Sequence, residues 1–175
     1  GVSPAVRAEW RRAFGYDRPI HEQFVRYLGS VARGDFGYSV VERRPVRNVI
    51  ADAVPRTLTL AVASVALAIL LGIGIGTAAA AKHGSRRDRV ISTLSVVVYS
   101  IPDFWLALIV QMSLGAGLGL FPISGIADPM AEYGSTGAVI VDRLEHMVLP
   151  VLTLTILVSV ILARFQRAAL IDVLP

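Results

Sequence analysis

Three long runs of apolar residues dominate the pattern along the chain. The first, Leu58 to Ala81, holds 24 residues without a charged side chain. As a helix it would reach roughly 36 Å, enough to cross the hydrocarbon of a bilayer with some tilt. Apolar helices of soluble proteins rarely run so long without a polar face. The pattern predicts membrane-spanning helices over residues 58–81, about 90–114 and about 147–163.

Polar residues interrupt the second run. Pro102, Asp103 and Gln111 all lie inside it. Proline frees a carbonyl and bends a helix, and an ionisable group in hydrocarbon must face protein or water. Asp103 therefore either lines a path through the membrane or pairs with a neighbouring helix or freed backbone, and Gln111 extends the same stripe two turns later. Ser100 is expected to hydrogen-bond the carbonyls that Pro102 frees. These four residues are the candidates for a translocation path or a helix interface.

The first 57 residues show helical spacing but no run long enough to span a membrane. Helices are predicted over residues 4–15, from Pro19 onward, and over residues 45–54. Pro55 is expected to kink the entry into the first span, whereas Pro150 falls in the first turn of the third, where a proline does no harm. The mixed charges of these helices favour packing on the end of a bundle over binding to a membrane surface.

The distribution of charge predicts an orientation. The short loop of residues 82–89 is basic, and such loops face the cytoplasm. Its cations are Lys82, Arg86, Arg87 and Arg89. The loop that ends at Glu145 has four acidic side chains against one arginine and suits the outer side, while Arg164 and Arg167 fit a cytoplasmic exit of the third span.

Three spans place the two ends of the chain on opposite sides of the membrane, with residues 1–56 outside the cytoplasm. That segment needs an earlier span to carry it across, so the chain is expected to be truncated upstream. Its ten arginines against six acids oppose this orientation. The segment approaches the roughly 60-residue length beyond which loop charge loses its influence, which weakens the objection.

Composition supports the membrane class and excludes others. Hydrophobic residues make up 54% of the chain and charged ones 17%, and the net charge is +4. The cations lack the aromatic interleaving of a nucleic-acid binder. The absence of cysteine excludes disulfides and thiolate metal sites, and the three histidines lack ligand spacing, so neither metal nor cofactor is predicted. Gly72-x-x-x-Gly76 is a pattern that lets two membrane helices approach closely.

Several short stretches, in order along residues 17–174, resemble the permease subunits of binding-protein-dependent ABC importers of the dipeptide, oligopeptide and nickel family. No single stretch is diagnostic, but the order and spacing of the set make coincidence a poor explanation. The stretches are Gly34-Asp35-Phe36-Gly37-Tyr38-Ser39, Pro45-Val46, Pro55-Arg56-Thr57-Leu58-Thr59-Leu60-Ala61, Asp88-Arg89, Ser100-Ile101-Pro102-Asp103-Phe104-Trp105, Phe121-Pro122-Ile123-Ser124-Gly125, His146-Met147-Val148-Leu149-Pro150 and the segment from Ala163 to Leu174.

The resemblance implies an all-α membrane protein in which these three spans are the second to fourth of a six-span type I permease. Residues 1–56 would be a helical extracytoplasmic segment and residues 57–175 the permease region. The permease would be truncated at both ends, and Pro175 would lie just before its cytoplasmic coupling helix. The implied partners are a second permease subunit, two cytoplasmic ATPase subunits that hydrolyse the ATP, and an external substrate-binding protein, all at the cell inner membrane.

Two other functions stay open on the residues alone. One is a membrane anchor or assembly subunit that does not transport. The other is an intramembrane hydrolase, which needs two aspartates, or a serine with a histidine, brought together in the membrane. Only Asp103 lies inside a predicted span, which argues against a hydrolase. The sequence does not identify the cargo, which in this family is a peptide, a nickel chelate or a related small solute.

Overall fold

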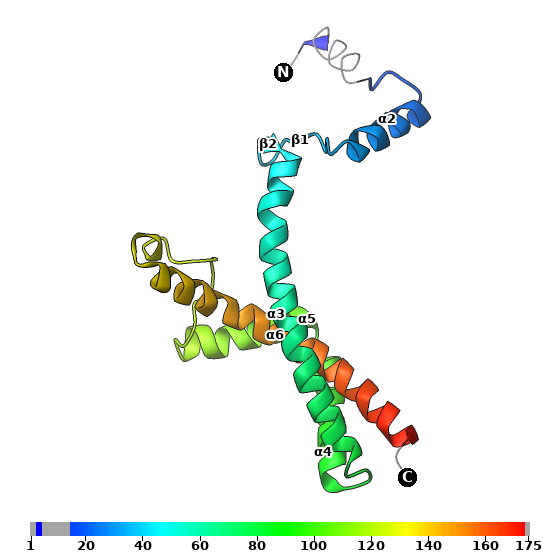
Figure 1. Cartoon of the computed structure of the whole chain (residues 1–175), viewed down its shortest axis with the longest axis vertical. Helices are drawn as coiled ribbons and strands as arrows, with labels where there is room; N and C mark the ends of the chain where they lie inside the picture. Colours follow the sequence, from blue (N-terminus) through cyan, green and yellow to red (C-terminus); the bar gives the residue numbers. More distant parts are fainter. Residues whose placement is uncertain (1–2, 5–14, 174–175) are drawn as a thin grey trace. The chain divides into compact units, whose positions relative to one another are not determined.

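The computed structural model describes residues 3–4 and 15–173. The chain divides into two compact units, Gly1–Arg56 and Thr57–Pro175. In the described part the regular elements are helices apart from one small hairpin (Figure 1). The helix predicted over residues 4–15 lies almost wholly outside the described residues.

In the first unit, helix α2 (Ile20–Ala32) has no buried residue. A hairpin of β1 (Tyr38–Ser39) and β2 (Arg44–Pro45) follows, with Tyr38 opposite Pro45. The turn is held by a hydrogen bond from the Tyr38 hydroxyl to the Arg43 carbonyl, and Arg43 adopts a left-handed backbone with φ of 51°. The sequence analysis did not predict the hairpin, whose strands are only two residues long.

Helix α3 (Val46–Ala80) runs 35 residues without a break. The sequence predicts a short helix up to Val54 and a separate span from Leu58, and this division is wrong because the helix continues through Pro55. A proline inside a helix removes one backbone hydrogen bond. The chain is helical on both sides of Pro55, so the helix survives this loss.

The second predicted span, residues 90–114, is not one helix. Helix α4 (Arg86–Ser100) ends before Ile101. Helix α5 (Asp103–Val110) begins after Pro102 and passes into a π-helical segment, η1 (Gln111–Gly117). The two parts are bent by 102°. Pro102 has no N–H to continue the helix, and it forces the residue before it into an extended conformation. The predicted bend is therefore a full break.

Helix α6 (Thr136–Val173) is much longer than the predicted span over residues 147–163. Ser135 begins it, because its hydroxyl accepts a hydrogen bond from the Ala138 N–H at 3.3 Å. Pro150 consequently lies deep inside α6 and not in its first turn, which corrects the prediction. A short 3-10 helix, η2 (Ala131–Tyr133), precedes it.

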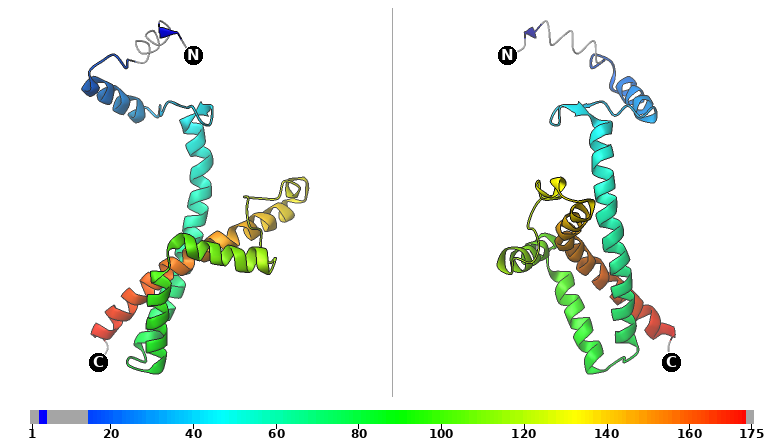
Figure 2. Two further views of the ribbon diagram at one scale, coloured as in Figure 1. Left: turned by 180° about the vertical axis from the view of Figure 1, so that it is seen from behind. Right: turned by 60° about the vertical axis from the view of Figure 1, so that its left-hand side comes forward.

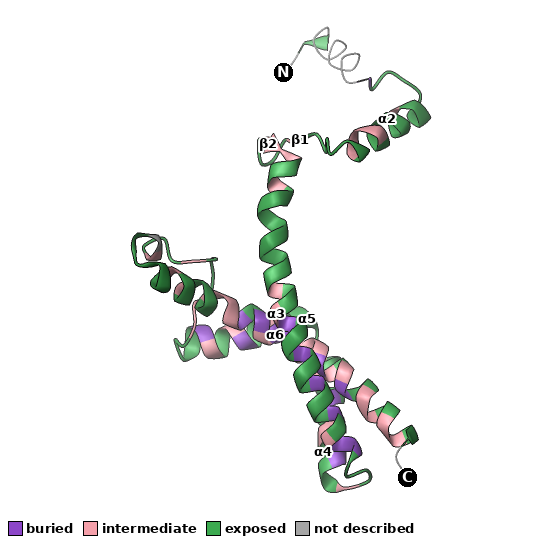
Figure 3. Cartoon of the chain, in the orientation of Figure 1, coloured by how far each residue is buried: buried purple, intermediate pink, exposed green. Residues whose placement is uncertain are grey.

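Two described helices, α3 and α6, are long and apolar enough to cross a membrane, and the bent pair α4–α5 adds a third if it counts as one span. This agrees with an all-α membrane protein, but the number of spans stays a prediction. Figure 3 shows buried residues where α3, α5 and α6 overlap in this view. Leu106 and Val110 of α5 pack on Leu149 of α6.

Helices α3 and α6 cross each other in both further views of the ribbon in Figure 2. Their contact is lined by small and polar residues at four-residue spacing. On each helix this spacing puts the residues on one face. The Thr155 hydroxyl of α6 donates to the Ser64 carbonyl of α3 at 3.3 Å. The buried residues at this spacing are Ser64, Ala68, Gly72 and Gly76 on α3, and Thr155, Ser159 and Ala163 on α6.

Candidate functional site

Helix α4 begins with a capping motif that places a carboxylate at its N-terminus. Ser85 is the N-cap, and its hydroxyl accepts a hydrogen bond from the Asp88 N–H at 3.3 Å. The Asp88 side chain turns back and accepts from the Gly84 N–H at 3.0 Å. Such reciprocal bonds satisfy donors that the first helical turn leaves unpaired, and the helix dipole favours a negative charge there. Local sequence therefore determines where this carboxylate lies.

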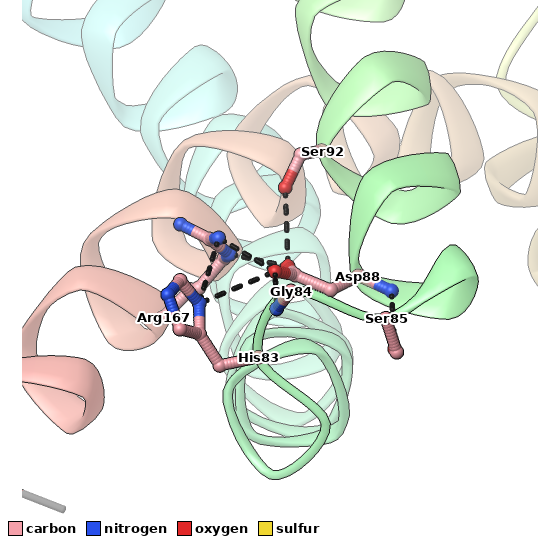
Figure 4. Close-up of polar contacts among 6 residues, drawn as sticks. All are labelled: His83, Gly84, Ser85, Asp88, Ser92 and Arg167. Atoms are coloured by element: carbon pink, nitrogen blue, oxygen red, sulfur yellow. Dashed lines mark hydrogen bonds and ion pairs between the residues drawn. The ribbon is translucent and has the colours of Figure 1, made fainter.

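Arg167 of α6 reaches the same carboxylate from the opposite helix. Its Nε donates to one Asp88 oxygen at 2.6 Å and its Nη2 to the other at 2.8 Å (Figure 4). A guanidinium and a carboxylate bind most strongly in this two-point geometry. The Ser92 hydroxyl, one turn along α4, donates to Asp88 at 3.4 Å. Because the Asp88 side chain is only 3% exposed, its charge depends on these partners.

The pairing changes the acidity of Asp88. This residue precedes the apolar run that begins at Val90, so it lies outside the stretch that we treat as spanning. The hydrogen bonds from Arg167 hold the pKa of Asp88 well below its usual range, against the opposing effect of burial, and the Gly84 N–H lowers the pKa further. Asp88 is therefore ionised at neutral pH.

His83 completes the cluster at its exposed edge. Its Nδ1 lies 3.3 Å from the Asp88 carboxylate and 3.3 Å from Arg167 Nη2. One ring nitrogen does not serve both partners at once: with a proton it donates to Asp88, and without one it accepts from Arg167. We call His83, Asp88, Ser92 and Arg167 the α4–α6 clamp, because it joins the first turns of α4 to α6.

Beside the clamp, α4 and α6 border a cavity of about 590 Å³. Arg164 of α6 lies over the ring of Tyr99 on α4, with its Cζ 5.2 Å from the ring centroid, a cation–π distance. In the part of the chain that the structure describes, Arg164 has no ion pair with an acid. The cavity is also lined by Ile91, Ser92, Ser95, Val96, Ile161 and Phe165.

Helices α3 and α6 approach closely at the two residues predicted for helix packing, Gly72 and Gly76. A Cβ added at Gly72 would lie 2.6 Å from the Leu162 Cβ, and one added at Gly76 would lie 2.6 Å from the Ala163 carbonyl oxygen. Both distances are shorter than real contacts allow, so the approach requires residues without a side chain. Gly74, between them, has nothing within 4 Å of such a Cβ.

Three of the predicted path residues lie at the break between α4 and α5. The Ser100 hydroxyl donates to the Val96 carbonyl of its own helix at 2.8 Å. It does not bond the carbonyls that Pro102 frees, so that expectation is wrong. Asp103 is not in mid-helix but is the first residue of α5, and it is exposed. Among the residues described, none forms a hydrogen bond or ion pair with its side chain.

Gln111, the fourth candidate, holds a loop. Its Nε2 donates to the Ile123 carbonyl at 2.6 Å. Ile123 also packs so closely on Gly115 that an added Cβ there would overlap its Cγ2. The segment after η1 therefore folds back onto it, and the Gln111 amide has a structural partner that the sequence pattern did not reveal.

The predicted basic loop is shorter than expected. Only Lys82 lies in the turn between α3 and α4, whereas Arg86, Arg87 and Arg89 belong to the first turn of α4. The helix starts earlier because Ser85 caps it. All four cations are exposed.

A second polar cluster lies near the beginning of α6. The His146 Nδ1 is 2.8 Å from the Asp142 carbonyl oxygen and 3.4 Å from the Asp142 carboxylate. The same carboxylate accepts from the Asp128 N–H at 3.0 Å. This cluster attaches the preceding loop to α6, and the side chains are already paired, so we assign it a structural role.

Sequence reasoning missed Tyr99 and the individual roles of Asp88, Arg164 and Arg167. A signal for Asp88 was present, because Ser85-Arg86-Arg87-Asp88 has the spacing of a capping box. No local pattern joins Asp88 to Arg167, which is 79 residues away. That contact follows only from the packing of α4 on α6.

Comparison with known proteins identifies similar chains. Residues 68–175 match the family described as binding-protein-dependent transport system inner membrane component. The chain is 32% identical to the di/tripeptide transport system permease protein DppB of Pseudomonas aeruginosa over 99% of its length and 55% of that protein. It is 33% identical to the oligopeptide transport system permease protein AppB of Bacillus subtilis, covering 99% of the chain and 54% of that protein.

A third relative is the glutathione transport system permease protein GsiC of Salmonella paratyphi A, 38% identical over 94% of the chain and 49% of that protein. The chain thus spans about half the length of these curated relatives.

Proposed function

The chain belongs to the family of binding-protein-dependent transport system inner membrane components, and we propose that it forms part of a permease subunit through which an ATP-driven importer moves di- or oligopeptides, or a related small solute. The observation that carries the proposal is the family match, which covers residues 68–175 and so includes the break between α4 and α5 and the whole of α6. The named cargoes of the three relatives support a peptide-like solute.

The broken helix pair supports a path for a polar solute. Membrane proteins tolerate irregular backbone at membrane depth only where it is covered by protein or lines a water-filled cavity. The break leaves the exposed Asp103 carboxylate at the N-terminus of α5, directly after Pro102, and Gln111 follows at the other end of α5. We propose that this region faces the translocation path or the partner permease rather than lipid, because an ionised group in hydrocarbon is costly.

We propose an orientation from the distribution of charge. The exposed cations at residues 82–89 support a cytoplasmic position for the start of α4, and with it an extracytoplasmic position for residues 1–56. On this reading the α4–α6 clamp lies on the cytoplasmic side. It ties α6 to α4 where ATPase subunits would drive movement, so the two helices would move as one body.

The proposed partners are a second permease subunit, two ATPase subunits and an external binding protein. Three spans with so much exposed apolar surface do not enclose a pore alone, which supports assembly with further helices. The ATPase subunits would supply the catalysis, and the chain itself would have no catalytic role.

Purification and reconstitution test this function. The intact natural protein that contains this chain should co-purify with a second permease and with ATPase subunits. In proteoliposomes supplied with the binding protein, we expect uptake of a radiolabelled dipeptide that requires ATP. Recovery of homodimers alone, or uptake that needs neither ATP nor the binding protein, would contradict the proposal and favour an anchor or assembly role.

A further inference from the structure

Helices α3 and α4 border a groove of about 410 Å³ whose floor is formed by α6. Arg87, in the first turn of α4, lines one end of it. Most of the remaining wall is apolar. The apolar wall includes Ile75 and Ala78 of α3, Ile91, Leu94 and Val98 of α4, and Val160 of α6. We propose that this groove binds an anionic phospholipid, with the phosphate on the Arg87 guanidinium and an acyl chain along the apolar wall.

The length of the groove matches one leaflet of a bilayer. Ile91, Leu94 and Val98 lie four, seven and eleven residues after Arg87, a spacing that repeats on one face of a helix. From Arg87 to Val98 a helix rises about 17 Å, and one leaflet contributes roughly half of the 30 Å hydrocarbon core. The groove therefore has the reach of an acyl chain, whereas a spanning helix needs about twice that length.

The charge at the Arg87 end suits a phosphate. Arg87 lies three residues before Val90, where the apolar run begins, so its guanidinium lies at the level of the lipid headgroups. The other cations of residues 82–89 are exposed nearby. Asp88, the acid among them, is already bonded twice by Arg167 and does not offset their charge. Basic pockets between spanning helices bind anionic headgroups, and a guanidinium holds a phosphate at two points.

A further span of the natural protein is the competing occupant, because its apolar side chains would also match the apolar wall. Such a contact leaves the positive charge at the Arg87 end without a complement. An anionic phospholipid matches both ends of the groove, the cation with its phosphate and the apolar wall with its acyl chain. Charge complementarity therefore favours the phospholipid.

Gly74 offers a way to fill the groove without disturbing its walls. It lines the groove on α3, and a Cβ added there would meet no atom within 4 Å in the described part of the chain. Gly74→Leu would therefore place a side chain in the space of the acyl chain. Gly72 and Gly76 are unsuitable for this purpose, because an added Cβ there meets α6.

The test uses the intact natural protein, as purified from membranes, in vesicles of phosphatidylcholine. A photoreactive phosphatidylglycerol with a diazirine on its acyl chain is compared with phosphatidylcholine that carries the same chain. After irradiation, mass spectrometry measures labelling of the peptides that contain Ile75 and Leu94. The salt concentration is about 0.5 M, where the screening length is about 4 Å, so that direct contact with the phosphate dominates.

We expect phosphatidylglycerol to label the groove several-fold more than phosphatidylcholine does. Arg87→Gln should lower labelling by phosphatidylglycerol about fivefold, the scale of one cation beside an anionic lipid, and leave labelling by phosphatidylcholine nearly unchanged. Arg89→Gln is the matched control, because it removes an exposed cation from the same turn that does not line the groove, and its effect should be less than twofold. Gly74→Leu should reduce labelling by both lipids.

Equal labelling by the two lipids in the natural protein overturns the assignment of an anionic ligand. Absence of labelling shows that another part of the protein fills the groove and also overturns it, as does an Arg87→Gln protein that keeps its full preference for phosphatidylglycerol. If Arg87→Gln does not assemble, Gly74→Leu decides: loss of labelling by phosphatidylglycerol supports the inference, and unchanged labelling overturns it. Because uptake is not measured, failure of this inference leaves the proposed function standing.

Discussion

Arg167 of α6 donates to both carboxylate oxygens of Asp88 on α4, at 2.6 and 2.8 Å, across 79 residues of sequence. Asp88 is also bonded to its own helix by the Gly84 N–H and the Ser92 hydroxyl. A buried carboxylate with partners on two elements connects them more specifically than apolar contact does. The pair therefore sets how α4 and α6 lie against each other at this end.

Breaking this pair should destabilise the protein. We expect Asp88→Asn to lower the thermal midpoint of the purified intact protein by several degrees, because it leaves the Arg167 charge without its counter-ion. Asp172→Asn, which removes an exposed acid from the same unit, should change the midpoint little. Differential scanning fluorimetry in detergent measures both. Equal effects of the two variants would contradict a specific role for the clamp.

A double-mutant cycle isolates the interaction itself. Arg167→Gln should cost about as much as Asp88→Asn, and the double variant should cost clearly less than the sum, because the two residues are in contact. Additive losses would mean that each residue acts through other partners. The readout is the thermal midpoint of all four proteins at one pH.

The lowered pKa of Asp88 predicts how the clamp responds to acid. A group with a depressed folded-state pKa contributes its full stability above the ordinary carboxyl value of about 3.9 and loses it as pH falls toward the depressed value. The difference in thermal midpoint between the natural protein and Asp88→Asn should stay constant from about pH 5 to 8. It should shrink below about pH 4. A difference that changes near neutral pH would assign the effect to another group.

The contact between α3 and α6 offers a test with an internal control. Gly72→Ala and Gly76→Ala should each destabilise the protein by about 1–3 kcal/mol, because the new Cβ meets Leu162 or the Ala163 carbonyl and forces the helices apart. Gly74→Ala should be neutral, or stabilising by up to about 1 kcal/mol, since its Cβ meets nothing and alanine favours a helix. Unfolding by denaturant or heat ranks the three variants.

These residues also show how far sequence reasoning reached. Hydrophobic runs predicted the apolar parts of α3 and α6 because length and composition alone decide whether a helix can span. The predicted ends of these helices differ from the observed ends. The start of α6 lies in a segment with Gly134, Gly137 and several acids, so the Ser135 cap went unnoticed and the loop was predicted to be longer than it is.

Pro102 illustrates a second limit. The sequence predicts a disturbed helix there, but whether a proline bends a helix or breaks it depends on what surrounds the freed backbone. In the structure α5 packs on Leu149 of α6, and this contact stabilises the broken conformation of the α4–α5 pair. The Arg167 bond to Asp88 and the Arg164 contact with Tyr99 depend in the same way on tertiary packing. The sequence supplied candidate charges but not their partners.

Orientation is testable because these 175 residues contain no cysteine. Single cysteines at Val41 and at Lys82, both exposed, are probed with a membrane-impermeant thiol reagent in intact cells. We expect labelling at Val41, in the proposed extracytoplasmic segment, and none at Lys82 until the cells are opened. The reverse pattern would overturn the orientation and move the α4–α6 clamp to the outer side.

Asp103 offers the sharpest test of the proposed path. As the first residue of α5 its carboxylate is stabilised by the helix dipole, and asparagine also suits a helix N-terminus, so Asp103→Asn should leave assembly and thermal midpoint nearly unchanged. The substitution removes the negative charge that would attract a peptide ammonium group in the path. We therefore expect it to slow uptake of a dipeptide with a free amino terminus several-fold more than uptake of its acetylated form. Glu145→Gln, which neutralises an exposed acid on α6, is the control and should not distinguish the two peptides. Equal losses together with a lower yield of the complex would show instead that Asp103 serves the packing of the permease.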